Sequence, residues 1–318
     1  MGSRTALAAL LLTVVPLTVV PLATPPAAAD APATSAAPAT IAYAKRTQAW
    51  ELVLSDGRVV KVPEALTKAP ADAVNPGVPA PFLVSRDGRH IFYFRRSDGV
   101  FVERTVRGAE HVVSRRLTAF SIGEEWPDVS DDGGYVVTTT SGPGVGIFAD
   151  LRKGKVLPPP GRTDAWSFLG FSPDGGRLLL AQEDRLTVFD RTLRARVSRK
   201  TRLSATALAN DHVTVAALVG RWPNYRQVRL LNLRTGRTSR TVTVRLPRGQ
   251  WVDDLSFDRA DHLIVRSRTR TGVTIYRVSA ATGRATPLRK IARPDTTVWV
   301  LPGDSTYEAW TERKRRDS

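Results

Sequence analysis

The stretch Phe171-Ser172-Pro173-Asp174-Gly175, which precedes the apolar run Leu178-Leu179-Leu180, decides the fold of this chain. An Asp-Gly pair ahead of an apolar run is typical of a tight turn between two β-strands, because Asp hydrogen-bonds its own backbone and Gly accepts a positive φ. The phrase recurs about every 40 residues, a period that predicts a propeller or an array. Further copies, some of them degenerate, are anchored at Asp87, Asp132, Asp211, Asp261 and Asp304.

Each period contains short strand-like runs separated by turn residues. After Asp87 the apolar run from His90 to Arg95 is followed by a Ser-Asp-Gly turn, by Val100 to Thr105 and by a run that begins at His111. Four strands per period are the pattern of a propeller blade, and six copies predict an all-β, six-bladed β-propeller. No long amphipathic helical pattern occurs outside the N-terminal residues, which makes a βαβ architecture improbable.

The two ends of the repeat region are each incomplete. Three strands are expected near the N-terminus and two near the C-terminus, at Ile41 to Ala44, Trp50 to Leu54, Arg58 to Val62, Thr297 to Leu301 and Tyr307 to Thr311. Joined, they complete one blade from both ends of the chain and remove exposed sheet edges. Seven blades is the alternative, if residues 41–62 form a blade with further strands.

The N-terminus has the pattern of an export signal. Residues 1–29 combine Arg4, an apolar stretch and an Ala27-Ala28-Ala29 cleavage site, which predicts a secretory signal peptide. Residues 30–40 form an Ala/Pro/Thr-rich linker, 41–312 the propeller and 313–318 a charged tail. We therefore expect a secreted protein, extracellular or associated with the cell wall, with no transmembrane segment after cleavage. Retention of the signal as an anchor is the alternative.

The composition restricts the partners. The formal charge is +17 and the chain contains no cysteine, so disulfides and thiol catalysis are excluded. A basic exported protein adheres to anionic polymers, although the excess of arginine over lysine also fits a GC-rich genome. Aromatic residues are sparse around the basic runs, so nucleic acid is not an expected partner. We expect a monomer that binds an unknown protein or an anionic cell-envelope polymer.

The residues of the repeat also resemble a known family. Phe171-Ser172-Pro173-Asp174-Gly175, with looser copies at Ser85 to Gly88 and Ser130 to Gly133, is similar to the repeats of TolB-like, WD-repeat-like propellers. The resemblance spans residues 41–310. It implies a six-bladed propeller that works outside the cytoplasm as a protein-interaction platform. The N-terminal domain that precedes the propeller in TolB is not visible here, so the resemblance does not extend to the role of TolB in translocation.

The sequence contains no recognisable catalytic apparatus. The histidines at positions 90, 111, 212 and 262 are not at metal-ligand spacing, and no G-x-S-x-G elbow occurs. We therefore predict no catalytic residue, no metal and no cofactor. The alternative is a propeller enzyme of the lactonase or lyase kind, with acidic residues holding a divalent cation in the channel.

Tryptophans and acids precede the first strand of several repeats, and these strands begin around the channel of a propeller. The side chains could form an aromatic, acidic recognition face for a cationic or peptide ligand. Packing between blades and capping of turns is the competing interpretation. The candidate binding residues are Trp126, Asp128, Asp164, Trp166, Trp251 and Asp253.

Overall fold

The computed structural model describes residues 38–140, 144–158, 166–220, 225–294, 296 and 298–304. The contacts divide the chain into Met1–Pro38 and Ala39–Ser318, and the fold is that of the second unit. The expected signal peptide, the tail and almost all of the linker lie outside the described residues. Their boundaries therefore stay predictions.

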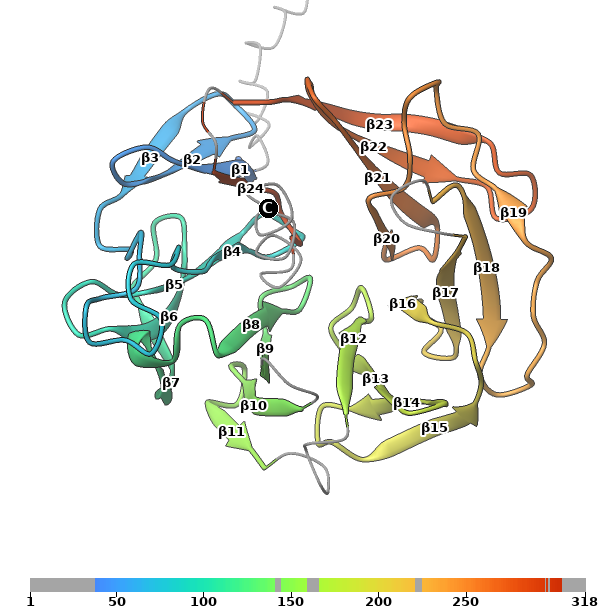
Figure 1. Cartoon of the computed structure of the whole chain (residues 1–318), viewed down its shortest axis with the longest axis horizontal. Helices are drawn as coiled ribbons and strands as arrows, with labels where there is room; N and C mark the ends of the chain where they lie inside the picture. Colours follow the sequence, from blue (N-terminus) through green and yellow to red (C-terminus); the bar gives the residue numbers. More distant parts are fainter. Residues whose placement is uncertain are drawn as a thin grey trace, which may run out of the picture. The chain divides into compact units, whose positions relative to one another are not determined.

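Six antiparallel sheets of four strands form a ring, as the six-bladed prediction requires (Figure 1). The first two blades are β4 (Phe82–Val84), β5 (His90–Phe94), β6 (Val100–Thr105), β7 (His111–Thr118), and β8 (Glu125–Val129), β9 (Tyr135–Thr140), β10 (Val145–Asp150), β11 (Lys155–Leu157). The third and fourth are β12 (Ser167–Phe171), β13 (Arg177–Gln182), β14 (Arg185–Asp190), β15 (Ala195–Lys200), and β16 (Ala205–Leu208), β17 (Thr214–Val219), β18 (Gln227–Asn232), β19 (Val242–Thr243).

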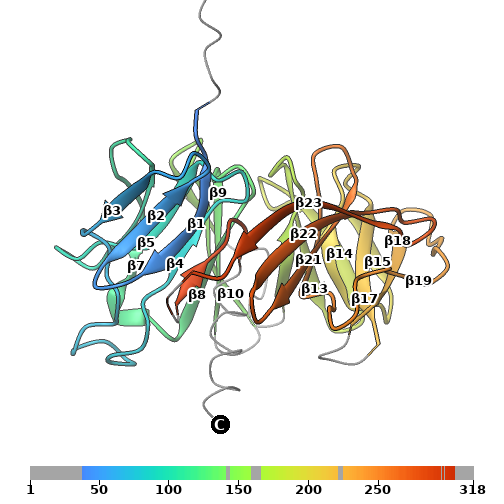
Figure 2. The same cartoon turned by 90° about the horizontal axis from the view of Figure 1, so that it is seen from above.

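The fifth blade and the closing sixth blade complete the ring, which Figure 2 shows from the side. They are β20 (Asp254–Phe257), β21 (Leu263–Thr269), β22 (Gly272–Val278), β23 (Ala285–Ala292), and β24 (Trp299–Val300), β1 (Ile41–Arg46), β2 (Trp50–Leu54), β3 (Val59–Val62). The only helix within the described ranges is the short 3-10 turn Ala119–Ser121. No described helix is long and apolar enough to cross a membrane.

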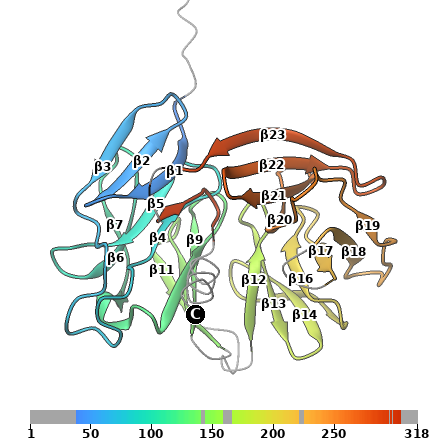
Figure 3. The same cartoon turned by 45° about the horizontal axis from the view of Figure 1, so that its top comes forward.

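The sixth blade joins the two ends of the chain. Its innermost strand β24 comes from the C-terminal side and lies beside β1 (Figures 1 and 3). The two strands pair antiparallel, so that Ala44 lies opposite Val300 and Lys45 opposite Trp299. This pairing confirms the predicted closure. It holds the ring shut by backbone hydrogen bonds within the sixth blade, between strands from the two ends of the chain. The second C-terminal strand, expected at Tyr307 to Thr311, lies outside the described residues.

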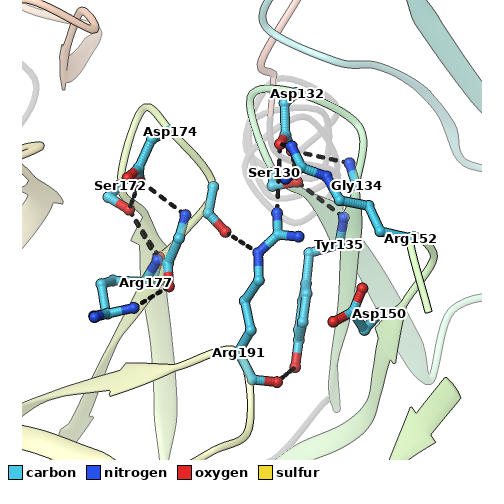
Figure 4. Close-up of polar contacts among 12 residues, drawn as sticks. Ser130, Asp132, Gly134, Tyr135, Asp150, Arg152, Ser172, Asp174, Arg177 and Arg191 are labelled. Atoms are coloured by element: carbon cyan, nitrogen blue, oxygen red, sulfur yellow. Dashed lines mark hydrogen bonds and ion pairs between the residues drawn. The ribbon is translucent and has the colours of Figure 1, made fainter.

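The repeated phrase forms the turn between the first and second strands of a blade. In the third blade Ser172 Oγ donates to Asp174 Oδ1 at 2.6 Å and accepts from the backbone N–H of Arg177 at 2.9 Å (Figure 4). The second blade has the same geometry at Ser130 and Asp132, with distances of 2.6 and 2.9 Å. Because each turn satisfies its own polar groups, the phrase is structural and forms the tight turn that the Asp-Gly pair predicts.

The turns of the fourth and fifth blades lack the glycine that ends the repeated phrase. His212 and Asp261 occupy the positive-φ position that glycine holds in the first three blades, each with φ near 61°. In the fifth blade the anchor is therefore shifted, because Asp258 takes the place of the serine and its Oδ1 accepts from the backbone of Ala260 and His262. Both replacements contact a neighbouring blade: His212 Nε2 lies 3.0 Å from Asp174 Oδ2, and Asp261 accepts from Asn210.

The core lies between the blades. Along β9, Tyr135 and Val137 pack with Leu178 and Leu180 of the third blade, whereas Val136 packs toward the first blade. This alternation is the period of two that a sheet buried on both faces requires. The outer strand of the fourth blade is short, since between Thr238 and Val244 only the two residues of β19 are regular.

Candidate binding channel

The innermost strands surround a cavity of about 580 Å³ along the axis of the ring. Residues of β8, β12, β16 and β20 line it, together with residues from the turns that follow β4, β8, β12 and β24. We call the end of the channel at these turns the turn mouth. The volume lies within the range of ligand pockets, roughly 300 to 1,000 Å³.

The wall of this cavity has two chemically different parts. One part is apolar and comes mainly from the third blade, where Phe168, Leu169 and Phe171 are half-buried. Leu208, Leu255 and Phe257 of the next two blades also border the cavity but are buried. Ser167 and Thr206 lie among them and are exposed to the cavity. The other part is charged, with Arg86, Asp128, Asp131, Asp254 and Asp304. A ligand there meets an apolar surface on one side and fixed charges on the other.

Arg86 connects four blades at the turn mouth. It belongs to the turn of the first blade, and its Nε lies 3.1 Å from Asp131 Oδ1 of the second blade. Its Nη1 contacts Asp254 Oδ2 at 3.5 Å and Ser256 Oγ at 3.1 Å in the fifth blade, and Nη2 donates to the carbonyl of Gly303. One side chain therefore ties the first blade to the second, fifth and sixth.

The charged network continues through two further arginines. The Arg266 guanidinium lies 3.0 Å from Asp254 and 2.5 Å from Asp304, and Arg268 lies 3.2 Å from Asp253 and 3.6 Å from Asp304. Arg266 is buried, with 6% of its side chain exposed. Alternating charges of this kind let buried ions compensate one another, which an isolated buried ion cannot do.

The ionisation of the two central carboxyl groups differs. Burial raises the pKa of Asp131 to about 6, and the positive charge of Arg86 only partly offsets this effect. Burial also acts on Asp254, but the charges of Arg266 and Arg86 outweigh it and hold its pKa below the usual value. Of these two carboxyl groups, Asp131 therefore titrates nearer to neutral pH.

The tryptophans predicted as binding residues lie mainly in packing positions. Trp126 is buried, with 3% of its surface exposed. Trp166 is half-buried and packs edge-on against Phe189, with ring centroids 5.4 Å apart. Trp251 is half-buried at the start of the fifth blade. None of the three lines the cavity, so their role in binding stays a prediction.

The predicted acids are divided between different surroundings. Asp128 lines the cavity, and its role in binding stays a prediction. Asp253 lies 3.2 Å from Arg268 and is part of the charged network. Asp164 lies outside the described residues. The predicted set is therefore brought together only in part.

Sequence reasoning missed Arg86, Asp131 and Asp304 as channel residues. A signal was present, because Arg86 and Asp131 hold the variable position of the Ser-x-Asp-Gly turn, and Pro173 holds it in the third blade. Arg86, Asp131 and Pro173 all line the cavity. In the first three blades the variable position of the turn, rather than its Asp-Gly pair, reaches the channel.

Within the described ranges, no group of three or more His, Cys, Asp or Glu side chains is placed to hold a metal ion. The channel carboxylates are instead adjacent to guanidinium groups, whose positive charge opposes a divalent cation at the same place. The propeller enzyme with a channel cation stays a prediction.

The fold defines the class of this protein as a six-bladed β-propeller. No known family and no curated protein matches its sequence. It is similar to the structure of TolB from Acinetobacter baumannii, with 17% identity over 79% of this chain and 64% of that one and a TM-score of 0.46. This chain thus spans less than two thirds of that TolB.

Two further solved structures are similar. A protein described as TolB from Agrobacterium tumefaciens is 12% identical over 80% of this chain and 91% of its own, with a TM-score of 0.43. Dipeptidyl peptidase 4 from Porphyromonas gingivalis is 14% identical over 68% of this chain and 40% of its own, with a TM-score of 0.40. At these identities the likeness concerns the fold alone and assigns no activity.

Proposed function

We propose that this chain is an exported, non-enzymatic binding propeller that holds part of a protein or of a cell-envelope component in its central channel. The observation that carries the proposal is the cavity of about 580 Å³, whose wall is apolar on one side and charged on the other. Binding sites commonly combine a mainly apolar surface with a few fixed polar groups. The export signal expected in residues 1–29 supports a partner outside the cytoplasm.

The charged side of the wall suits recognition. Arg86 and Asp131 are held by contacts between blades, so their positions do not depend on a ligand. Groups that are fixed before binding lose little conformational freedom when a ligand arrives. A partner segment with an apolar side chain beside a polar or charged group would match both parts of the wall.

Two variants of the fourth blade test the proposal. Thr206 is exposed on the innermost strand and lines the cavity, whereas Thr243 is exposed on the outermost strand. Thr206→Trp should fill the cavity, and Thr243→Trp is the matched control. Full-length protein of each kind is incubated with culture supernatant and cell-wall fractions at low and moderate salt, and the captured material is compared.

The expected result is a partner that wild type and Thr243→Trp retain at moderate salt and that Thr206→Trp loses. Retention by all three proteins would contradict binding in the channel. Loss from all three at moderate salt would leave only the adhesion that the net charge of +17 explains.

A further inference from the structure

A second cavity, of about 340 Å³, lies at the seam between the fifth and sixth blades. Side chains of β21, β22 and β23 line one side, and Ile41, Leu301 and Pro302 line the other. It adjoins the central cavity, and six residues border both: Arg86, Asp131, Pro173, Asp254, Ser256 and Phe257. At one end the seam is closed by a small cluster of Val273, Ile291 and Leu301 with Tyr43 and Trp299.

The face of the fifth blade that borders this cavity alternates apolar and basic side chains. Arg266, Ile275 and Arg289 lie in one row across three strands, because Arg266 pairs with Ile275 and Ile275 pairs with Arg289. Ile264 also lines the cavity, and Leu288 adds an apolar side chain at its rim with 48% of its surface exposed. Apolar surface is thus left partly open beside guanidinium groups.

The arginines of this cavity fall into two groups. Arg86 and Arg266 are paired with Asp131, Asp254 and Asp304. Among the described residues, neither Arg259 nor Arg289 is within ion-pair distance of a carboxylate, and Arg289 is half-buried. A half-buried cation beside an apolar groove favours an anionic group on a ligand whose remainder is apolar.

We propose that this cavity, the seam pocket, binds one single-chain anionic amphiphile, such as a fatty acid, with its chain along Ile264 and Ile275 and its head group at Arg289. A peptide strand fits the site less well, since the site lies on the face of a sheet and would leave peptide N–H and C=O groups without partners. A polymethylene chain has no such groups. A cavity of 340 Å³ has room for a chain of about ten methylene-sized groups, each comparable to a water molecule.

The test uses sodium laurate, below its micellar concentration, and the full chain in isothermal titration calorimetry. Wild type should bind one laurate, and each methylene removed from the chain should weaken binding about four-fold. Dodecyltrimethylammonium, which has the same chain and a cationic head, should bind at least ten-fold more weakly. Equal binding of the two amphiphiles, or no binding of laurate, would overturn the proposal.

Variants locate the site. Arg289→Gln should weaken laurate binding about ten-fold, and Ile275→Trp should abolish it by filling the pocket. Arg284→Gln is the matched control, since Arg284 is exposed on the same blade and does not line the pocket. Thr206→Trp, which blocks only the central channel, should bind laurate as wild type does. Loss of binding in Thr206→Trp, with Arg289→Gln unaffected, would place laurate in the channel and overturn the proposal.

Two other occupants are also tested. Binding to vesicles of anionic phospholipid without binding of monomeric laurate would show a membrane contact and overturn the proposal. Sedimentation would reveal a second copy of the chain as the occupant, through a dimer that Ile275→Trp dissociates. A monomer that binds one laurate supports the proposal.

Discussion

The Nε atom of Arg86 lies 3.1 Å from Oδ1 of Asp131, which belongs to the next blade. The two side chains occupy the same position in successive copies of the repeated turn, so the repeat itself brings opposite charges together at the channel. The Arg86 side chain retains 30% exposure because it borders the cavities, yet it lies deep in the channel. It is the side chain on which the charged wall of the channel depends.

Replacement of this arginine should destabilise the ring. Arg86→Met leaves Asp131 and Asp254 near the channel axis without its guanidinium, which should lower the free energy of unfolding by about 2 kcal/mol. Urea denaturation measures the change. Arg89→Met is the control, since Arg89 is an exposed arginine of the same turn and should change stability little. Equal effects of the two substitutions would contradict the role assigned to Arg86.

The raised pKa of Asp131 predicts a specific dependence on pH. Its pKa is about 6 in the folded chain and near 3.9 when unfolded, so the folded state binds more protons between these values. Stability from this group therefore rises as pH falls from 7 to 4. Relative to Asp131→Asn, wild type should gain on the order of 2 kcal/mol over this interval. A constant difference between the two proteins would show that Asp131 titrates normally.

The serine of the turn should contribute measurably to stability. Ser172→Ala removes the donor to Asp174 and the acceptor of the Arg177 N–H, at a cost of about 1 to 3 kcal/mol. The fourth blade offers the reverse experiment, because Ala209 stands where the turns of the first three blades have serine. Ala209→Ser should gain up to about 1 kcal/mol by pairing with Asp211. Thermal and urea unfolding test both, and a neutral Ser172→Ala would be inconsistent with the turn described.

At position 212, a glycine variant should be more stable than an alanine variant, which is the reverse of the usual order of stability. Its φ of 61° is unfavourable for any residue with a Cβ, by roughly 1 to 2 kcal/mol. His212→Ala keeps this strain and loses the contact with Asp174, whereas His212→Gly loses the contact and relieves the strain. We expect the glycine variant to be the more stable by about 1 kcal/mol. A more stable alanine variant would mean that the backbone there is not left-handed.

Much of the fold could be predicted because its determinants are local. Ser172 and Asp174 contact each other within one turn, so the phrase identifies the turn wherever it occurs. The closing blade was also predictable, since incomplete strand sets stand at both ends of the sequence. The shifted turn of the fifth blade was not, because Asp258 replaces serine with a different side chain that makes equivalent backbone contacts.

The candidate site was less predictable because its contacts join distant parts of the sequence. Arg86 contacts Asp254, 168 residues away, and nothing near Arg86 in the sequence indicates that partner. Trp126 shows another limit, since a tryptophan beside acids fits recognition as well as packing, and only the structure shows that its side chain is buried. Only the closed ring places the variable turn residues around one channel.

Site-specific photo-crosslinking tests the central claim, that the channel holds the partner, most directly. A benzophenone side chain is placed at Ser167, which is exposed in the cavity, or at Thr243 on the outermost strand, and cells that export the full chain are irradiated. The account predicts a discrete adduct at Ser167 that is absent at Thr243. Adducts that are equal at both positions, or present only at Thr243, would contradict it.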